Sequence, residues 1–446
     1  MSAGDGAGII FGLDPLWLSS GILVVTYGLL FFETLHRTVV ALAGAGLVVI
    51  SGLVDQDQAI AGVDFNTIAL LTGMMMIVAV LRTTGLFEYI AIWSAKKVGG
   101  DARGVLVVLA LVTAVFSAFL DNLTTVLLMV PVALVIAEKL EVTPYPYMLS
   151  QILASNIGGT ATLIGDPPNI LIGSATGLTF VDFLDHMGPV VLIVLAVSIA
   201  AFTLIWGRQL KGDPAHRARI MHFREAQAIT DGRRLAKSLV VLAVVIAGFI
   251  VGEHYGVRPG TTAMTGAAVL LAVIGHHDSM PGQARRLHET FSEVEWETLF
   301  FFIGIFVVVA GVQHAGVLKL LGAELLRLSG GDAKTATFAT LWLAAVVSAI
   351  IDNIPFVATM IPLVESMEAA IGGKQALEPV WWALALGACF GGNGSLIGAA
   401  ANVMVAGLGE RAGYPITFKR FLAVGLPMML VSMLIASVYM YFRHFA

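Results

Sequence analysis

The sequence predicts an all-α polytopic membrane protein built from two inverted-topology repeats, each with about five transmembrane helices, a re-entrant helical hairpin and a broken helix. Three observations lead to this fold class. Of the 446 residues, 58% are hydrophobic and only 12% are charged, and apolar runs long enough to cross a bilayer recur along the chain. Several short motifs occur twice in the same order. Each half holds an odd number of predicted crossings, so the halves must point in opposite directions.

The predicted elements follow the same order in both halves. We expect an N-terminal tail over 1–14, a first repeat over 15–207, a basic linker over 208–235 and a second, inverted repeat over 236–446. The first repeat has predicted spans at 15–33, 37–53, 66–82, 147–176 and 187–207, with hairpin arms at 104–120 and 124–138. The second has predicted spans at 236–253, 260–275, 296–312, 380–407 and 421–441, with a hairpin over 336–364.

One repeated motif precedes the third span of each half. Val63-Asp-Phe-Asn-Thr67 matches Val294-Glu-Trp-Glu-Thr298. A second motif forms the bends of the two hairpins, where Ser117-Ala-Phe-Leu-Asp121-Asn122 matches Ser348-Ala-Ile-Ile-Asp352-Asn353. An ionisable side chain in hydrocarbon is costly and usually marks an ion or substrate path. Two copies therefore indicate one site assembled from two halves.

A third motif interrupts one span in each half. Gly158-Gly-Thr-Ala-Thr-Leu-Ile-Gly165-Asp-Pro-Pro-Asn169 matches Gly391-Gly-Asn-Gly-Ser-Leu-Ile-Gly398-Ala-Ala-Ala-Asn402. Glycine relaxes the backbone and proline removes N–H donors, so a regular helix cannot continue through these stretches. Unwound backbone at membrane depth must be buried in protein or line a wet cavity. The predicted hinge residues are Gly158, Gly159, Gly165, Pro167, Pro168, Gly391, Gly392, Gly394 and Gly398.

The polar residues of these motifs are the candidate ligands of an ion or a small substrate. They are Asp121, Asn122, Thr124, Thr125, Thr160, Thr162, Asp166, Asn169, Asp352, Asn353, Asn393, Ser395 and Asn402. Burial favours the neutral form of a carboxyl group and a bound cation favours the ionised form, so a proton and a cation can compete for one group. A sodium ion would lie at Asp121, Asn122, Asp352 and Asn353.

The two half-sites are predicted to be unequal. Asp166 has Ala399 as its counterpart, and Pro167-Pro168 has Ala400-Ala401, so one half-site should bind the coupling ion more tightly. Structural alternatives remain open for the carboxylates. Asp121 and Asp352 could cap helices at the hairpin bends, and Asp166 could form an Asx-turn before the two prolines.

Charge predicts the orientation. The segment from Arg208 to Lys237 carries eight Lys and Arg residues, which the positive-inside rule assigns to the cytoplasm. The N- and C-termini then lie outside, and the chain is a multi-pass protein of the cell membrane.

The hairpin and break motifs resemble those of the ion transporter superfamily, which holds arsenite permeases, NhaD-type sodium/proton antiporters and divalent-anion/sodium symporters. Asp121-Asn-Leu-Thr-Thr and Asn156-Ile-Gly-Gly-Thr-Ala-Thr-Leu-Ile-Gly-Asp-Pro-Pro-Asn169 are most similar to its P-protein branch, the ArsB/NhaD or arsenite-permease-like group. The resemblance implies a ligand role for Asn122 and Asn353. It also implies a homodimer in which the hairpins and broken helices slide against a scaffold, as in an elevator.

The predicted function is ion-coupled secondary active transport by alternating access, without enzyme activity. Arsenite-type efflux of a small inorganic ion or oxyanion is favoured, because Asn and Thr suit a neutral hydroxide. Na⁺/H⁺ antiport comes second, and dicarboxylate/sodium symport third, since the symporters' hairpin Ser and Thr are replaced here and carboxylates repel an organic anion. An intramembrane aspartyl protease and a passive channel are distant alternatives, and the chain has no Gly-x-Gly-Asp element.

The expected partners follow from this function. They are the lipid bilayer, a small ion, a second copy of the chain, and no nucleic acid. The coupling ion is H⁺ or Na⁺, with no organic cofactor. No Gly-x-x-x-x-Gly-Lys-Ser/Thr string is present, so the energy must come from an ion gradient or a partner ATPase. The single cysteine, Cys389, excludes an internal disulfide and a Cys-based metal site.

Overall fold

The computed structural model describes residues 12–32, 35–210, 214–276, 279–328 and 330–446. Every regular element in these ranges is a helix, as the sequence predicts. Eight of the described helices are long and apolar enough to cross a membrane. Most of the predicted tail at 1–14 and the linker residues 211–213 lie outside the described residues.

The helices of the two halves follow one order. Those of the first half are α1 (Pro15–Phe32), α2 (Arg37–Ile50), α3 (Gln56–Ala61), α4 (Phe65–Arg82), α5 (Leu86–Lys97), α6 (Ala102–Phe119), α7 (Asn122–Lys139), α8 (Tyr145–Gly159), α9 (Pro167–Thr176) and α10 (Phe180–Trp206). The connecting segment holds α11 (Pro214–Met221) and η2 (Glu225–Ala228). Those of the second half are α12 (Gly232–Val251), η3 (Gly252–Tyr255), α13 (Pro259–Gly275), α14 (Met280–Ser292), α15 (Trp296–His314), α16 (Val317–Leu328), α17 (Ala333–Ser348), α18 (Asn353–Ser366), α19 (Glu368–Ile371), α20 (Lys374–Gly391), α21 (Ala400–Arg411) and α22 (Phe418–His444).

The hairpins and breaks lie where the sequence predicts them. Helices α6 and α7 meet at Asp121, and α17 and α18 meet at Asp352. The predicted span 147–176 is divided into α8 and α9, and the span 380–407 into α20 and α21. The last turn of α8 requires glycine, because a Cβ atom at Gly158 would lie 2.2 Å from the Ala114 carbonyl oxygen of α6. The small glycine lets the two helices touch at the point where the chain unwinds.

Six helices form a frame in which the repeats exchange partners. The frame consists of α1, α2, α4, α12, α13 and α15, in which α4 packs on α13 and α15 packs on α2. The close approaches correspond, since a Cβ atom at Gly73 would lie 2.5 Å from the Ala263 carbonyl carbon, and one at Gly304 would lie 2.6 Å from that of Ala41. Each repeat therefore supplies half of both pairs.

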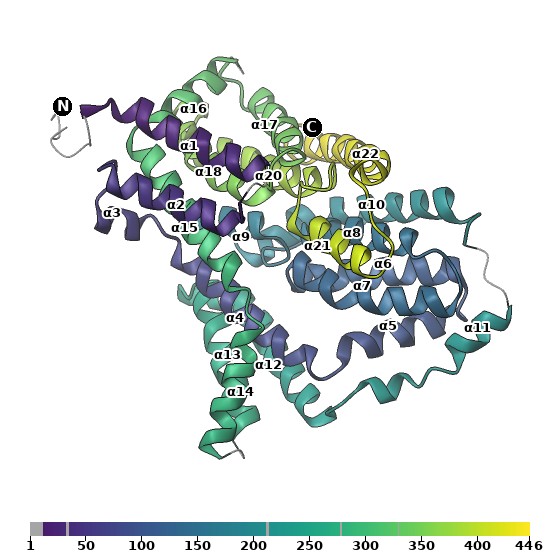
Figure 1. Cartoon of the computed structure of the whole chain (residues 1–446). Helices are drawn as coiled ribbons and strands as arrows, with labels where there is room; N and C mark the ends of the chain where they lie inside the picture. The colour runs from purple at the N-terminus through teal and green to yellow at the C-terminus, as the bar shows by residue number, and fades with distance from the viewer. Residues whose placement is uncertain (1–11, 33–34, 211–213, 277–278, 329) are drawn as a thin grey trace.

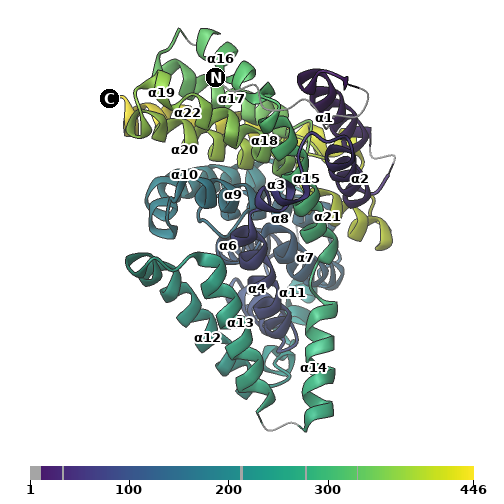
Figure 2. The ribbon, with the colours of Figure 1, turned by 90° about the vertical axis from the view of Figure 1, so that its left-hand side faces the viewer.

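The hairpins and broken helices form a second group, which we call the inner body: α6–α10, α17, α18 and α20–α22. Here too the halves interlock, because α9 packs on α18 and α20 while α21 packs on α7 and α8. Figure 1 shows α9 and α21 in the middle of the molecule, with the frame to the left and below. Figure 2 shows α12, α13 and α14 extending away from the inner body.

The outer surface is apolar over long helices, as contact with lipid requires. Trp17 of α1, Leu204 of α10 and Val240 of α12 are all exposed. A soluble monomer rarely exposes apolar residues so extensively. The chain is accordingly a multi-pass membrane protein.

Candidate functional site

Both hairpin carboxylates cap the helix that follows them. The Asp121 carboxylate accepts hydrogen bonds from the Thr124 N–H at 2.8 Å and from the Thr124 hydroxyl at 2.5 Å. The Asp352 carboxylate accepts one from the Ile354 N–H at 3.1 Å. The capping interpretation of these two residues is therefore correct. A cap engages only some of the lone pairs of a carboxylate, so it leaves room for another ligand.

Each break is closed by an asparagine from the helix that follows it. The Asn169 amide donates to the Thr162 carbonyl at 2.9 Å and to the Thr160 carbonyl at 3.2 Å. The Asn402 amide donates to the Gly392 and Ser395 carbonyls at 2.7 and 2.9 Å. Backbone carbonyls freed by unwinding need such partners when they are buried. Asn169 and Asn402 thus hold the breaks in shape.

A further buried asparagine, Asn156, joins the two halves. Its amide donates to the side-chain oxygens of Asn393 and Asn402, each at 2.9 Å, and its oxygen accepts from the Asn122 amide at 3.2 Å. The counterpart of Asn156 in the second repeat is Cys389, whose thiol donates to the Asn169 side-chain oxygen at 3.4 Å. Sequence reasoning missed the role of Asn156, since a cysteine at the matching position hid the repeat.

A small cavity of about 20 Å³ lies where the hairpins and breaks converge, and we call it the central chamber. Its polar lining consists of Asp121, Asn122, Asp166 and Asn353 of the inner body together with Arg37, Glu295 and Thr298. A cavity holds one water molecule when roughly 10–15 Å³ of it is open to the centre of that molecule. The central chamber therefore has room for about one water molecule or one dehydrated ion.

Asp166 is the most enclosed of the three predicted carboxylates. It is 1% exposed, and one of its oxygens accepts from the Asn353 amide at 3.4 Å. The other oxygen is buried and has no hydrogen-bond partner among the described residues. Its side chain caps no N–H of α9, so the Asx-turn interpretation of Asp166 is wrong. A buried carboxylate oxygen without a partner is costly unless it is protonated or binds a cation.

The third predicted carboxylate, Asp352, is paired with Arg37, a residue that sequence reasoning missed. The Arg37 guanidinium lies 3.3 Å from the Asp352 carboxylate and donates to the Thr298 hydroxyl at 3.2 Å. Arg37 begins α2 and lies far from the motifs in the sequence. A cation at the end of a predicted span gives information about membrane orientation, and nothing in the sequence connects it to the site. Glu295 was interpreted only as part of a repeated motif, although it lines the central chamber.

The other predicted ligands surround the central chamber without lining it. The hydroxyl of Thr160 donates to the Asn156 carbonyl and that of Thr162 to the Ala118 carbonyl. Among the described residues, the hydroxyls of Thr125 and Ser395 and the amide nitrogen of Asn393 have no partner. No group of three or more His, Cys, Asp or Glu side chains in the described ranges is arranged to hold a metal ion. Sodium there would also need amide or carbonyl oxygens.

A larger cavity of about 560 Å³, which we call the vestibule, leads to Asp352 from one side. Its walls include Arg37 and Phe301 of the frame and Val403 and Arg411 of α21. It therefore lies between the frame and the inner body.

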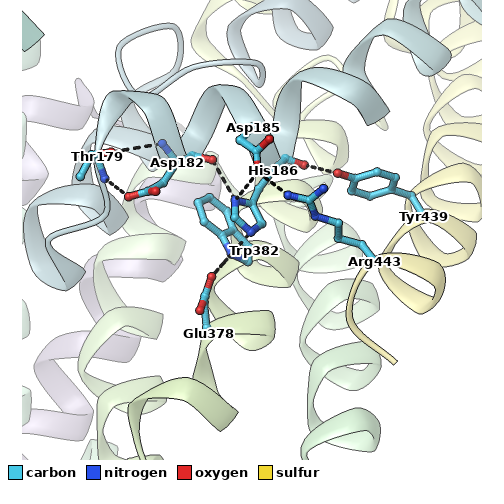
Figure 3. A network of polar contacts seen from close by, with 8 residues as sticks. All are labelled: Thr179, Asp182, Asp185, His186, Glu378, Trp382, Tyr439 and Arg443. Carbon is cyan, nitrogen blue, oxygen red and sulfur yellow. Dashed lines mark hydrogen bonds and ion pairs between the residues drawn. The ribbon is translucent and has the colours of Figure 1, made fainter. Parts of the chain in front are cut away.

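A separate polar cluster ties the ends of three helices of the inner body together (Figure 3). The His186 ring of α10 stacks on Trp382 of α20, with centroids 4.4 Å apart. The Tyr439 hydroxyl of α22 donates to the His186 carbonyl at 2.8 Å, and Arg443 pairs with Asp185. None of these residues lines the central chamber or the vestibule, so we assign the cluster a structural role.

Comparison with known proteins agrees with this architecture. A family described as citrate transporters, CitMHS, matches residues 27–387. Two uncharacterized transporters of Mycobacterium tuberculosis are each 41% identical over 428 residues, covering 95% of this chain and 97–98% of theirs. The human P protein is 32% identical over 510 residues, which cover 96% of this chain and 60% of the P protein. The crystal structure of the Alcanivorax borkumensis YdaH transporter has a TM-score of 0.61 at 16% identity, covering 97% and 98% of the two chains.

Proposed function

This chain belongs to the citrate transporter family CitMHS, a family of membrane transporters and not of enzymes, and we propose that it is an ion-coupled secondary active transporter. In this proposal a proton and a small cation compete for the central chamber. The frame stays fixed while the inner body moves in an elevator-like way to expose the chamber to one side at a time.

One observation carries the proposal: the two carboxylates of the first repeat that line the central chamber form no ion pair with the described residues. Asp121 and Asp166 both line the central chamber, and neither forms an ion pair with the described residues, because Arg37, the cation that also lines it, is paired with Asp352. Two carboxylates in a buried space bind a proton or a metal cation more readily than they remain unpaired. Exchange of one for the other is the simplest coupled cycle.

The size of the central chamber supports a single small ion as the coupled species. At about 20 Å³, it has room for one Na⁺ or one water molecule. Arsenite carries three oxygens and would need more room. We therefore rank Na⁺/H⁺ exchange above arsenite-type efflux. In arsenite-type efflux, Asn122 and Asn353 would supply the amide ligands.

An anionic cargo is a second candidate, and the vestibule is the observation that favours it. The basic residues that line this cavity of about 560 Å³ are His36, Arg37 and Arg411, and of these Arg411 has no carboxylate partner among the described residues, whereas His36 and Arg37 face Glu297 and Asp352. It is large enough for an organic acid, since ligand pockets commonly begin at about 300 Å³. In such a cycle citrate or another carboxylate would enter at the vestibule, and the ion in the central chamber would drive it.

The proposal also includes the orientation and assembly expected from the sequence. The basic linker then lies in the cytoplasm, both termini lie outside, and two copies associate in the bilayer of the cell membrane. Protease accessibility of the linker in sealed right-side-out and inside-out vesicles tests the orientation, and cross-linking in membranes tests the dimer.

Flux in liposomes tests the function. Purified protein is reconstituted with a pH-sensitive dye inside, and Na⁺, arsenite or citrate is added outside under an imposed pH gradient. We expect uphill proton movement with one of these ions, and loss of that movement in Asp121→Asn. Dissipative flux that follows each ion's own gradient would indicate a channel, and unchanged coupling in Asp121→Asn would contradict the site.

A further inference from the structure

We infer that the molecule contains a second access path to the central chamber, related to the vestibule by the internal repeat and closed by a latch between Asn66 and Ser174. This inference rests on the proposed function, because a second path is needed only if the chamber opens to two sides. It adds the residues that keep one side closed.

Each repeat has a cavity between the frame and the second helix of its broken pair. A cavity of about 260 Å³ lies between the frame and α9, as the vestibule lies between the frame and α21. The offsets of the repeated motifs relate their walls. Glu297, Phe301 and Val403 line the vestibule, and their counterparts Asn66, Leu70 and Ile170 line the second cavity. The two cavities are thus equivalent surfaces of the two repeats.

The two cavities differ in whether they reach a hairpin tip. The vestibule reaches the hairpin tip of its repeat at Asp352, but the second cavity stops short of the matching tip at Asp121. Only a space of about 10 Å³ lies between the second cavity and Asp121. Leu70 and Ile170 line both this space and the second cavity, and Phe119 joins them in the space. An apolar plug therefore separates the second cavity from the central chamber.

A hydrogen bond between two residues that line the second cavity joins the frame to the inner body. The Asn66 amide of α4 donates to the Ser174 hydroxyl of α9 at 3.1 Å, so a frame helix is joined to the inner body. The Asn66 oxygen is held in place by the Gly260 N–H at 2.9 Å. At the vestibule the same two positions are Glu297 and Gly407, and a glycine cannot complete such a bond.

The two sides are therefore built differently. Glu297 lies 3.2 Å from the His36 ring instead of bridging to α21, and the Arg411 side chain donates to the Gly407 carbonyl of its own helix at 3.3 Å. The structure corresponds to a state open at Asp352 and latched at Asn66. Opening the second path must break the Asn66–Ser174 bond and separate Leu70 from Ile170.

Thiol labelling of the purified full chain in lipid nanodiscs tests the inference. The matched pair Ile170→Cys and Val403→Cys places one thiol in the plug and one at the equivalent position of the vestibule. Native Cys389 is buried, so the unmodified protein is the blank. We expect a water-soluble methanethiosulfonate reagent to modify Val403→Cys much faster, since Val403 is 43% exposed and Ile170 is 2% exposed.

Adding Ser174→Ala then removes only the latch. We expect roughly a two- to tenfold faster reaction at Ile170→Cys and a slower one at Val403→Cys, as the loss of one hydrogen bond shifts the balance of the two states. Thr176→Ala is the matched control, because the Thr176 hydroxyl bonds only to nearby backbone, donating to the Ile172 carbonyl and accepting from the Leu178 N–H, and does not reach the frame. It should change neither rate.

Three results would overturn the inference: equal reactivity of the two thiols, no effect of Ser174→Ala, or an increase at both positions, which would mean general loosening. The labelling uses no ion gradient. Failure of every ion to move in liposomes, with the labelling pattern intact, would therefore count against the proposed function and leave the two paths standing.

Discussion

The two hairpin tips occupy equivalent places in the two repeats, yet they have different electrostatic partners. The Asp121 carboxylate bonds to Thr124 of its own hairpin, with no ion pair to the described residues. The Asp352 carboxylate is paired with Arg37 of the frame. The breaks differ in the same sense, because the first carries Asp166 and the second carries Ala399. Of the three carboxylates at the tips and breaks, the two without an ion pair therefore both belong to the first repeat.

This difference shows how a symmetric fold can hold an asymmetric site. The repeat supplies two hairpins and two breaks, each closed by its own asparagine. Substitutions at a few equivalent positions then make one half a place for a movable ion and the other a fixed ion pair. The backbone arrangement is shared, and the charge is not.

The largest expected effect comes from removing the Asp166 carboxylate, which has no counterpart in the second break. Asp166→Asn should reduce gradient-driven proton flux in liposomes to that of empty vesicles, since an amide cannot exchange a proton for a cation. The control is the double variant Asp352→Asn/Arg37→Gln, which removes both charges of the fixed pair and should keep coupled flux. Equal loss in both proteins would remove the distinction between the two repeats.

Splitting the fixed pair should affect stability more than coupling. Asp352→Asn leaves the Arg37 guanidinium without its anion, and we expect a loss of about 1–3 kcal/mol because both groups are partly buried. Adding Arg37→Gln should restore most of it. The exposed pair of Arg82 and Glu293 is the comparison, and removing it should cost about 0–1 kcal/mol.

Thermal unfolding in detergent measures these differences. If Asp352→Asn is no less stable than the unmodified chain, Arg37 does not depend on that carboxylate, and the two tips do not differ in their need for an ion pair.

The equivalent residues Asn156 and Cys389 should contribute unequally to stability. Asn156→Ala removes three hydrogen bonds to buried amides and should cost roughly 2–4 kcal/mol. Cys389→Ala, at the equivalent position, removes one weak thiol donor and should cost about 1 kcal/mol. The same unfolding assay compares them, and equal costs would mean that the Asn156 network adds nothing beyond packing.

The smallest effect concerns the surface, where ion pairs hold the linker against the first repeat. The Lys96 ammonium of α5 bonds to the Glu225 carboxylate at 2.6 Å, and this bond holds the pKa of Glu225 below its usual value. On the equivalent helix α16, Arg327 pairs with Glu324 of its own helix. The stabilisation from Glu225 is present above the pKa of a free glutamate, about 4.3, and is lost as the pH falls through the lowered value.

Cleavage of the linker by an acid-active protease should therefore rise as the pH falls below about 4. Glu225→Gln should be cleaved faster at higher pH, with a flatter dependence. A pH profile in Glu225→Gln identical to that of the unmodified chain would show that this ion pair does not hold the linker.

Much of the fold could be predicted because its unusual parts are costly in hydrocarbon. Asp121, Asp352 and the glycine-rich breaks have no reason to occur twice in apolar sequence except as bends and unwound helices, and they lie there. The asparagines Asn169 and Asn402 belonged to the same motifs, and their role of closing the breaks follows from the unpaired carbonyls of each break.

The partners of the site could not be predicted in the same way. Arg37 reaches Asp352 across 315 residues of sequence, and a cation near a helix end is also what topology alone requires. Asn156 differs from its repeat counterpart Cys389, so comparison of the halves concealed it. Asn66 and Ser174 are ordinary helix residues until packing brings them together. Tertiary contacts between repeats decided these roles.

Proton release on cation binding tests the central claim most directly. Na⁺ is added to the purified protein in a weakly buffered detergent solution, and the pH change gives the protons released for each protein. We predict release by the unmodified chain and by Asp352→Asn/Arg37→Gln, and loss of release in Asp121→Asn and Asp166→Asn. Release from Asp166→Asn equal to that of the unmodified chain would contradict the account.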